Sequence, residues 1–190
     1  MRHVISALVV NEPGVLANVA GMFAARGFNI DSLVVGRTED PNLSRMTIVV
    51  DADENTLEQV RKQLAKLVPV TQVKDFKDSA YIERDLALVT IAAGPAHRAE
   101  VIEIVTLFRG KVVDVGKESL MVELSGTETK IEAFVELVKP YGVRELARTG
   151  VIAMTRGMQK GQEAEKSSAP AGGKRKRSLD APAAAALPPS

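Results

Sequence analysis

The sequence predicts an α+β protein built from two similar domains in tandem and followed by a disordered tail. Hydrophobic periodicity gives the order strand, helix, strand, strand, helix, strand, and this order occurs twice. Residues 22–31 and 106–115 fall at equivalent places in the two halves, which indicates a structural tandem. Beyond residue 157 large apolar residues almost vanish, so burial there cannot offset the entropy of ordering. We therefore predict domains at 1–77 and 78–157 and a disordered tail at 158–190.

The first half contains the clearest helix signals. Pro13 suits a first helical turn because it lacks an N–H group, and Gly27 makes a suitable stop. The second helix, at 53–67, starts with acidic residues that favour a helix N-terminus. Strands are predicted around these helices at 3–10, 29–38, 44–52 and 70–76.

The second half repeats the pattern after a short polar link at 77–85. Two helices are predicted, at 96–110 and 127–142. Strands are predicted at 86–93, 111–118, 119–126 and 143–157.

A βαββαβ unit with right-handed crossovers gives a four-stranded antiparallel sheet with two helices on one face, the ferredoxin-like plan. The second strand of such a unit lies at a sheet edge. Here it contains the stretch SLVVG, which has no Lys or Pro to block pairing. An unblocked edge invites another chain. We therefore expect a homodimer that forms through this strand, with insertion into the chain's own second half as the alternative.

Composition excludes several classes of protein. The 190 residues carry a formal net charge of +1, so no overall field recruits nucleic acid or a membrane. Aromatic residues make up only 4%, which argues against a base-stacking surface. No apolar run reaches the roughly 18 residues of a membrane span. Cysteine is absent, which excludes disulfides and fits a reducing compartment, so we expect a cytoplasmic protein.

The loop between the first strand and the first helix is the candidate binding site. Free backbone N–H groups at a helix N-terminus favour a carboxylate or a phosphate. Gly14 removes a Cβ that would obstruct approach, and Asn11 can both donate and accept, which suits an α-amino acid. Val15, Leu16 and Ile30 could surround a small aliphatic side chain. A purely structural role stays open, because Asn caps helices and Gly eases turns.

The stretch NEPGVLANVAGMFAARGFNIDSL resembles the opening motif of the ACT domain, a regulatory module that binds amino acids. Five further stretches (RTEDPNLSRMTIVV, LEQVRKQLAKLVPVTQV, RDLALVTI, FRGKVVDV and ARTGVIAMTRG) occur in an order that resembles the small regulatory subunit of acetohydroxyacid synthase, also called acetolactate synthase. The resemblance covers residues 2–157.

The resemblance implies a non-catalytic subunit of branched-chain amino acid biosynthesis. It would activate a large catalytic subunit and confer feedback inhibition, usually by valine, with leucine and isoleucine left open. The effector would lie between two ACT domains, held by Asn11, Gly14 and Val15 of one chain and by Asn29 and Ile30 of the other. No cofactor is implied in this chain; thiamine diphosphate, Mg and FAD are expected only in the catalytic subunit. The equivalent loop of the second half, AAGPAHRAE, lacks the Asn, so no second site is predicted there.

No catalytic or metal-binding constellation is predicted. His3 and His97 have no evident partners, and no P-loop or Rossmann glycine pattern is present. The alternative function is a free-standing ACT sensor that regulates another amino-acid enzyme or a transcription factor. Co-purification with a large thiamine-diphosphate enzyme would separate the two readings.

Overall fold

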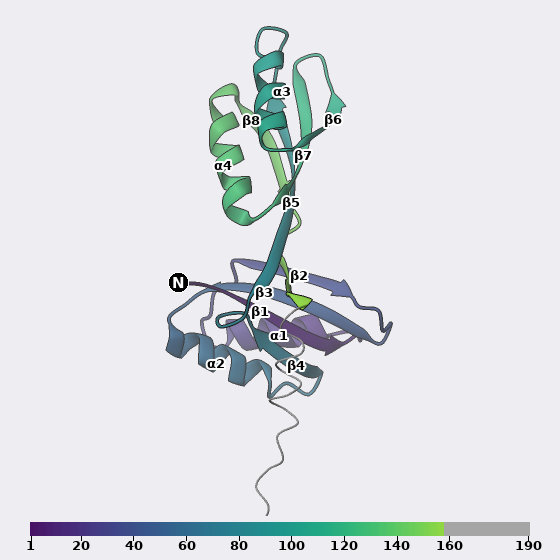
Figure 1. The fold of residues 1–190 in the computed structure, drawn as a ribbon. Coiled ribbons are helices and arrows are strands. Elements are labelled where there is room, and N and C mark those ends of the chain that lie inside the picture. The colour runs from purple at the N-terminus through teal and green to yellow at the C-terminus, as the bar shows by residue number, and fades with distance from the viewer. Residues whose placement is uncertain (158–190) are drawn as a thin grey trace, which may run out of the picture.

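The computed structural model describes residues 1–157, which form two α+β domains joined by a long strand (Figure 1). The N-terminal sheet has the order β2-β3-β1-β4 and the C-terminal sheet the order β6-β7-β5-β8. Both orders, with their antiparallel neighbours, are those of the predicted ferredoxin-like plan, and β2 lies at a sheet edge as predicted. The tail prediction for 158–190 lies outside the described residues.

The N-terminal domain consists of β1 (Arg2–Val10), α1 (Val15–Ala24), β2 (Ser32–Arg37), β3 (Leu43–Asp51), α2 (Glu54–Leu64) and β4 (Val70–Asp75). The C-terminal part consists of β5 (Tyr81–Ala92), α3 (Arg98–Leu107), β6 (Lys111–Val115), β7 (Ser119–Gly126), α4 (Glu128–Val138), a short 3₁₀ helix (Lys139–Tyr141), β8 (Val143–Arg148) and β9 (Ile152–Thr155). No helix within residues 1–157 is long and apolar enough to cross a lipid bilayer.

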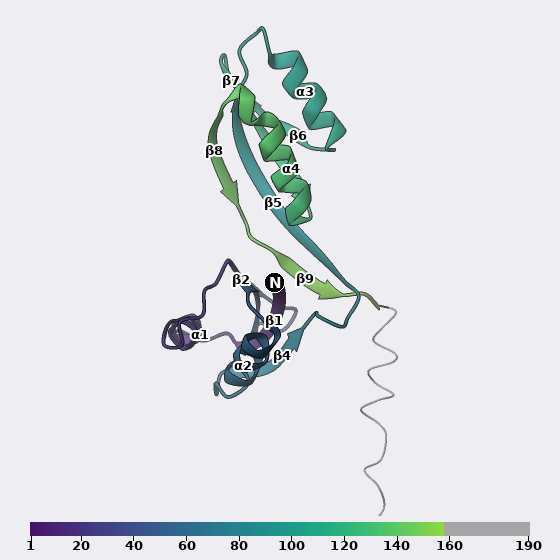
Figure 2. The same cartoon turned by 90° about the vertical axis from the view of Figure 1, so that its left-hand side faces the viewer.

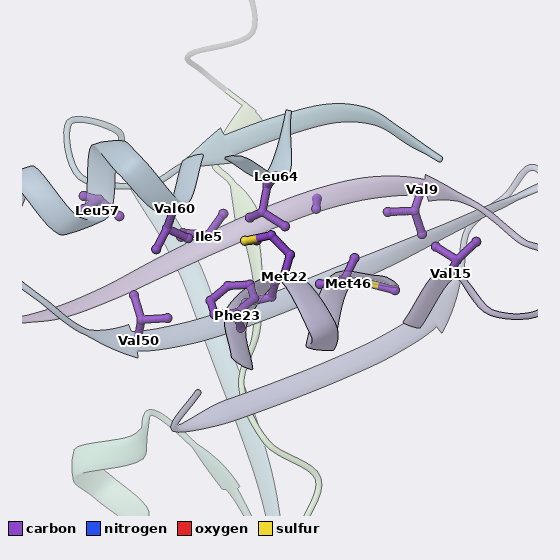
Figure 3. Packing of buried hydrophobic residues seen from close by; sticks show 13 residues of the cluster. Ile5, Val9, Val15, Met22, Phe23, Met46, Val50, Leu57, Val60 and Leu64 are labelled. Carbon is purple, nitrogen blue, oxygen red and sulfur yellow. The ribbon is translucent and has the colours of Figure 1, made fainter. Parts of the chain in front are cut away.

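Each sheet buries one face under its two helices. In the N-terminal domain, Phe23 of α1 and Leu64 of α2 meet Ile5 and Met46 of the sheet in one close-packed core (Figure 3). A second core of the same kind includes Phe134 and Ile91 in the C-terminal domain. Burying one such side chain contributes about 1.5–3 kcal/mol, so each domain has its own stabilising core.

Two boundaries at the first site differ from the prediction. Helix α1 begins at Val15, with Gly14 as its N-cap, so Pro13 precedes the helix rather than occupying its first turn. The reason is the backbone of Gly14, whose φ of +85° lies in the left-handed region and cannot continue a right-handed helix. Strand β2 begins at Ser32, so Asn29 and Ile30 lie in the loop that leads into it.

The prediction of one last strand at 143–157 is wrong. Gly150 has a φ of +87° and divides it into β8 and β9. The link at 77–85 is also not a simple polar connection, because β5 begins within it at Tyr81. The first four residues of β5 pair with β9, and the rest pair with β7 and β8. Figure 2 shows β5 and β9 running together as a two-stranded arm between the domains.

The arm packs on the face of the N-terminal sheet that the helices leave uncovered. Val4 and Val49 of the sheet form a third core with Val151 and Ala153 of the arm segment and with Phe76. Tyr81 lies against this core, with its ring centroid 4.8 Å from that of Phe76. The second half of the chain therefore supplies part of the packing of the first.

Ion pairs join the same two parts of the chain. Arg2, at the start of β1, pairs with Glu83 of β5 at 3.0 Å and with Glu128 of α4 at 2.6 Å. Partial burial opposes the charge of Arg2, but its hydrogen bonds and charge contacts with the two glutamates hold its pKa above the ordinary value. This guanidinium stays charged and bridges the domains.

Asp85 anchors the turn between β8 and β9. Its carboxylate, 2% exposed, accepts hydrogen bonds from the Nε of Arg148 at 2.7 Å, the hydroxyl of Thr149 at 3.2 Å and the backbone N–H of Gly150 at 3.1 Å. Asp85→Ala leaves these donors without their acceptor, so we expect a loss of about 2–4 kcal/mol in the free energy of unfolding. Urea unfolding measures it, with Asp114→Ala, at an exposed position of β6, as the control. Equal losses in the two variants would contradict the anchoring role.

Candidate effector site

The loop after β1 presents a helix N-terminus to solvent. Gly14 is exposed, and a Cβ added there would meet nothing within 4 Å. The N-cap offers no side-chain hydrogen bond to α1. Among residues 1–157, the backbone N–H groups of Leu16 and Ala17 have no hydrogen-bond partner, and that of Val15 makes only a long contact of 3.5 Å with the carbonyl of Glu12. These uncommitted donors, at the positive end of the helix, suit a carboxylate.

Asn11 holds this loop against the start of β3. Its Nδ2 donates to the carbonyl of Pro41 at 3.0 Å, and its Oδ1 accepts from the hydroxyl of Ser44 at 3.2 Å. An Asn side chain has two N–H donors and two acceptor positions, so one of each remains. Asn11 therefore has a structural role, but it anchors the loop and does not cap α1, whose N-cap is Gly14, and it leaves capacity for a ligand.

The apolar residues of the predicted site divide into two groups. The side chain of Val15 lies in the core, so only its backbone faces the loop. Ile30 packs partly against the same core, while Leu16 stays 47% exposed. Val35 is 43% exposed and pairs with Met46, which places it on the helix side of the sheet. Apolar surface is thus available along the edge formed by α1 and β2.

Within one chain the two halves of the predicted site lie apart. The N–H of Asn11 donates to the carbonyl of Asn42, the residue directly before β3. The N–H of Asp31 donates to the carbonyl of Val49, near the other end of β3. The two acceptor residues are seven steps apart along the chain, or about 24 Å in an extended strand. Asn29, which donates to the carboxylate of Asp31 at 2.8 Å, therefore cannot reach the loop of its own Asn11.

Antiparallel pairing of two β2 edges would bring the halves together. Strands β1 and β2 are both antiparallel to β3, so β2 ends at the side of the sheet where Asn11 lies. In an antiparallel pair the start of one strand faces the end of the other. Asn29 of a second copy would then approach Asn11 and Gly14 of the first. The assignment of Asn11, Gly14, Val15, Asn29 and Ile30 stays a prediction.

The equivalent loop of the C-terminal domain is arranged differently. A Cβ at Gly94 would lie 2.7 Å from the Oε2 of Glu118, so a carboxylate already lies against this turn. The two histidines make local contacts: His3 contacts the carbonyl of Ala52 at 3.1 Å, and His97, the N-cap residue of α3, lies 3.3 Å from Glu100.

Sequence reasoning missed the contact between the start of β2 and the arm. The hydroxyl of Ser32 accepts from the N–H of Val151 at 3.2 Å, although the two residues are 119 positions apart. The signal was the segment GVIAMT, where Gly150 precedes alternating residues of which Val151 and Ala153 are buried.

Comparisons with known proteins agree over both domains. The family model for the ACT domain of acetohydroxyacid synthase small subunits matches residues 5–72, and that for the small subunit of acetolactate synthase matches residues 84–157. The acetolactate synthase small subunit of Mycolicibacterium smegmatis is 48% identical over 82% of this chain and 91% of its own length, and that of Bacillus subtilis is 44% identical over 84% of this chain and 93% of its own length.

A solved structure is similar over the same region. The crystal structure of the small subunit of acetolactate synthase from Thermotoga maritima superimposes with a TM-score of 0.76 at 42% identity, over 82% of this chain and 98% of that one. With matches of this identity over nearly the full length of its relatives, the chain belongs to the family of acetolactate synthase small subunits.

Proposed function

We propose that this chain is a non-catalytic regulatory subunit that activates the catalytic subunit of acetolactate synthase and makes it sensitive to a branched-chain amino acid. Membership of the small-subunit family carries the proposal, because family models match residues 5–72 of the first domain and 84–157 of the second. The catalytic partner would be a thiamine-diphosphate enzyme that also holds Mg and FAD, and this chain would need no cofactor of its own. The pair would work in the cytoplasm, in valine, leucine and isoleucine biosynthesis.

The site supports an amino-acid effector. The free N–H groups at the start of α1 suit its carboxylate, and the remaining Oδ1 capacity of Asn11 suits its ammonium group. Leu16 and Val35 supply half-exposed apolar surface beside them. Valine is the first effector to test, with leucine and isoleucine beside it.

A homodimer through the ACT domain would complete that site. Strand β2 ends the sheet within residues 1–157, and α1 carries no charged residue along its ten positions. An uncharged helix beside an unblocked strand edge is the composition of a surface that a partner covers. The proposed dimer has a two-fold axis between the paired β2 strands and therefore two equal sites.

Reconstitution of the enzyme tests the function directly. The purified chain alone should form no acetolactate from pyruvate, and its addition to the catalytic subunit should raise that subunit's activity at least about tenfold, a barrier change of about 1.4 kcal/mol. Valine should then lower the activity of the mixture but not that of the catalytic subunit alone. Acetolactate formation by the chain alone, or no effect on the catalytic subunit, would contradict the proposal.

A further inference from the structure

The start of β2 fits closely against Gly150 and Val151, the turn that leads into β9 of the arm. The Oγ of Ser32 accepts from the N–H of Val151, and a Cβ at Gly150 would lie 2.7 Å from that same Oγ and 2.8 Å from the Cγ2 of Val34. Only glycine tolerates both this approach and a φ of +87°. We call the contact of Ser32 and Val34 with Gly150 and Val151 the joint.

The joint is connected to the candidate effector residues. Asn29 bonds to Asp31, the residue before Ser32, and the N–H of Asp31 bonds to the carbonyl of Val49. The side chain of Val49 packs in the third core with Val151. A change in the position of the loop at Asn29 therefore reaches the arm by two routes, through Ser32 and through Val49.

On its other side the joint is tied to the C-terminal domain. Asp85 accepts from the N–H of Gly150, and through Arg148 it holds the end of β8. Arg148 also lies 3.6 Å from Glu128 at the start of α4. A displacement of Gly150 thus moves the strand and the helix that frame one end of the C-terminal domain.

Two partly open pockets adjoin the joint. A cavity of about 300 Å³ lies between the start of β2 and the turn, lined by Ser32, Leu33, Asp85, Thr149 and Gly150. A second cavity of about 310 Å³ adjoins it and shares Asp31 and Glu128. Close-packed cores change between discrete arrangements, and open space beside a contact permits such a change.

We infer that the joint couples effector binding to the inhibition of the catalytic subunit. An amino acid held by Asn29 and Ile30 stabilises the contact between the arm and β2, and this contact sets the position of the C-terminal domain. The inference rests on the proposed function and assigns its transmission to Ser32, Gly150 and Asp85. A ligand shifts an equilibrium only by its difference in affinity for the two states. A variant that weakens the contact between the arm and β2 should therefore reduce the inhibition by the effector more than it reduces the affinity for the effector.

The test uses the full chain with the catalytic subunit, and three variants. Ser32→Ala removes the acceptor of the Val151 N–H, and Ser32→Thr keeps a hydroxyl as the rescue. Gly150→Ala forces the turn away from β2, whereas Gly157→Ala, where a Cβ meets nothing within 4 Å, is the matched control. Valine, leucine and isoleucine are titrated by calorimetry, and the one that binds the wild type is used throughout.

The expected result is a separation of binding from response. Ser32→Ala should bind the effector within about tenfold of the wild type, in line with the loss of one hydrogen bond that the ligand does not touch. Its activation should be unchanged, while its activity at saturating effector should rise at least about twofold, since the coupling factor falls. Gly150→Ala should show the larger loss, and Ser32→Thr and Gly157→Ala should match the wild type.

Hydrogen exchange gives an independent measure. Effector should slow exchange of the Val151 N–H in the wild type by at least about threefold, because that donor is held only while the arm is seated. If Gly150→Ala does not fold, Ser32→Ala and this measurement still decide the matter. If the effector inhibits the wild type and Ser32→Ala equally, the inference is wrong. It is also wrong if the effector inhibits the wild type but leaves the exchange rate of the Val151 N–H unchanged. Both results leave the proposed function intact. A wild type that neither binds nor responds overturns the proposed function, and the inference with it.

Discussion

Replacement of Gly14 by aspartate is expected to abolish feedback inhibition while activation survives. The new carboxylate would sit at the start of α1, where the N–H groups of Leu16 and Ala17 are uncommitted. It would compete for the donors that the effector carboxylate needs and would repel that carboxylate. A hydrogen bond to a charged group contributes on the order of 1.5–3 kcal/mol, so the loss of one weakens binding about tenfold or more. Inhibition curves and calorimetric titration with valine measure the effect.

Two substitutions at the same position separate charge from backbone strain. Gly14 has a φ of +85°, where alanine costs roughly 1–2 kcal/mol and Asn and Asp are tolerated better. Gly14→Ala carries that strain without an acceptor, and Gly14→Asn carries an acceptor without the charge. We expect inhibition to fall in the order Ala, Asn, Asp, with similar melting temperatures for Asn and Asp and a slightly lower one for Ala. Equal inhibition in Gly14→Asp and wild type would remove the start of α1 from the effector site.

The fold followed from the sequence because local signals and burial agree in most elements. Hydrophobic periodicity located the helices that contain Phe23, Leu64 and Phe134, and these side chains are indeed fully buried. Periodicity could not show where a chain leaves one sheet and joins another. That step occurs at Gly150, whose positive φ ends β8, and the pairing of β9 with Tyr81–Arg84 depends on residues about 70 positions away. The only local sign of this long-range pairing in the sequence is the short alternating segment Ile152–Thr155.

The candidate site was only partly accessible to sequence reasoning. Gly14 could be recognised because glycine at a helix start signals either a backbone approach or a positive φ, and the structure shows the positive φ directly. The side-chain direction of Val15 depends on where α1 begins, which the sequence misplaced by two residues, and it points into the core. The bonds of Asn11 to Pro41 and Ser44 depend on the loop between β2 and β3, which carries no periodic pattern.

A site shared between two chains makes a sharp prediction for mixtures of variants. In one chain Asn11 and Asp31 bond to residues of β3 and its approach that lie about 24 Å apart along the strand, so Asn11 and Asn29 can serve one effector only if they come from different copies. Asn11→Ala and Asn29→Ala homodimers should each bind valine about tenfold or more weakly, since each site has lost one polar contact to a charged ligand. Unfolding curves check that Asn11→Ala keeps its fold without the bonds to Pro41 and Ser44.

The heterodimer of the two variants should recover half of the binding. One of its sites combines both damaged residues, and the other combines an intact Asn11 with an intact Asn29, since the two-fold axis makes the sites reciprocal. Two different affinity tags allow the heterodimer to be purified, and calorimetry should then find about one valine bound per heterodimer with the wild-type affinity. Linkage adds a second expectation: valine should tighten the wild-type dimer by the same factor by which dimerisation tightens valine binding. Heterodimers that form yet bind no better than either homodimer would show that Asn11 and Asn29 do not meet across the β2 edge, and would leave the loop at Asn11 as a site within one chain.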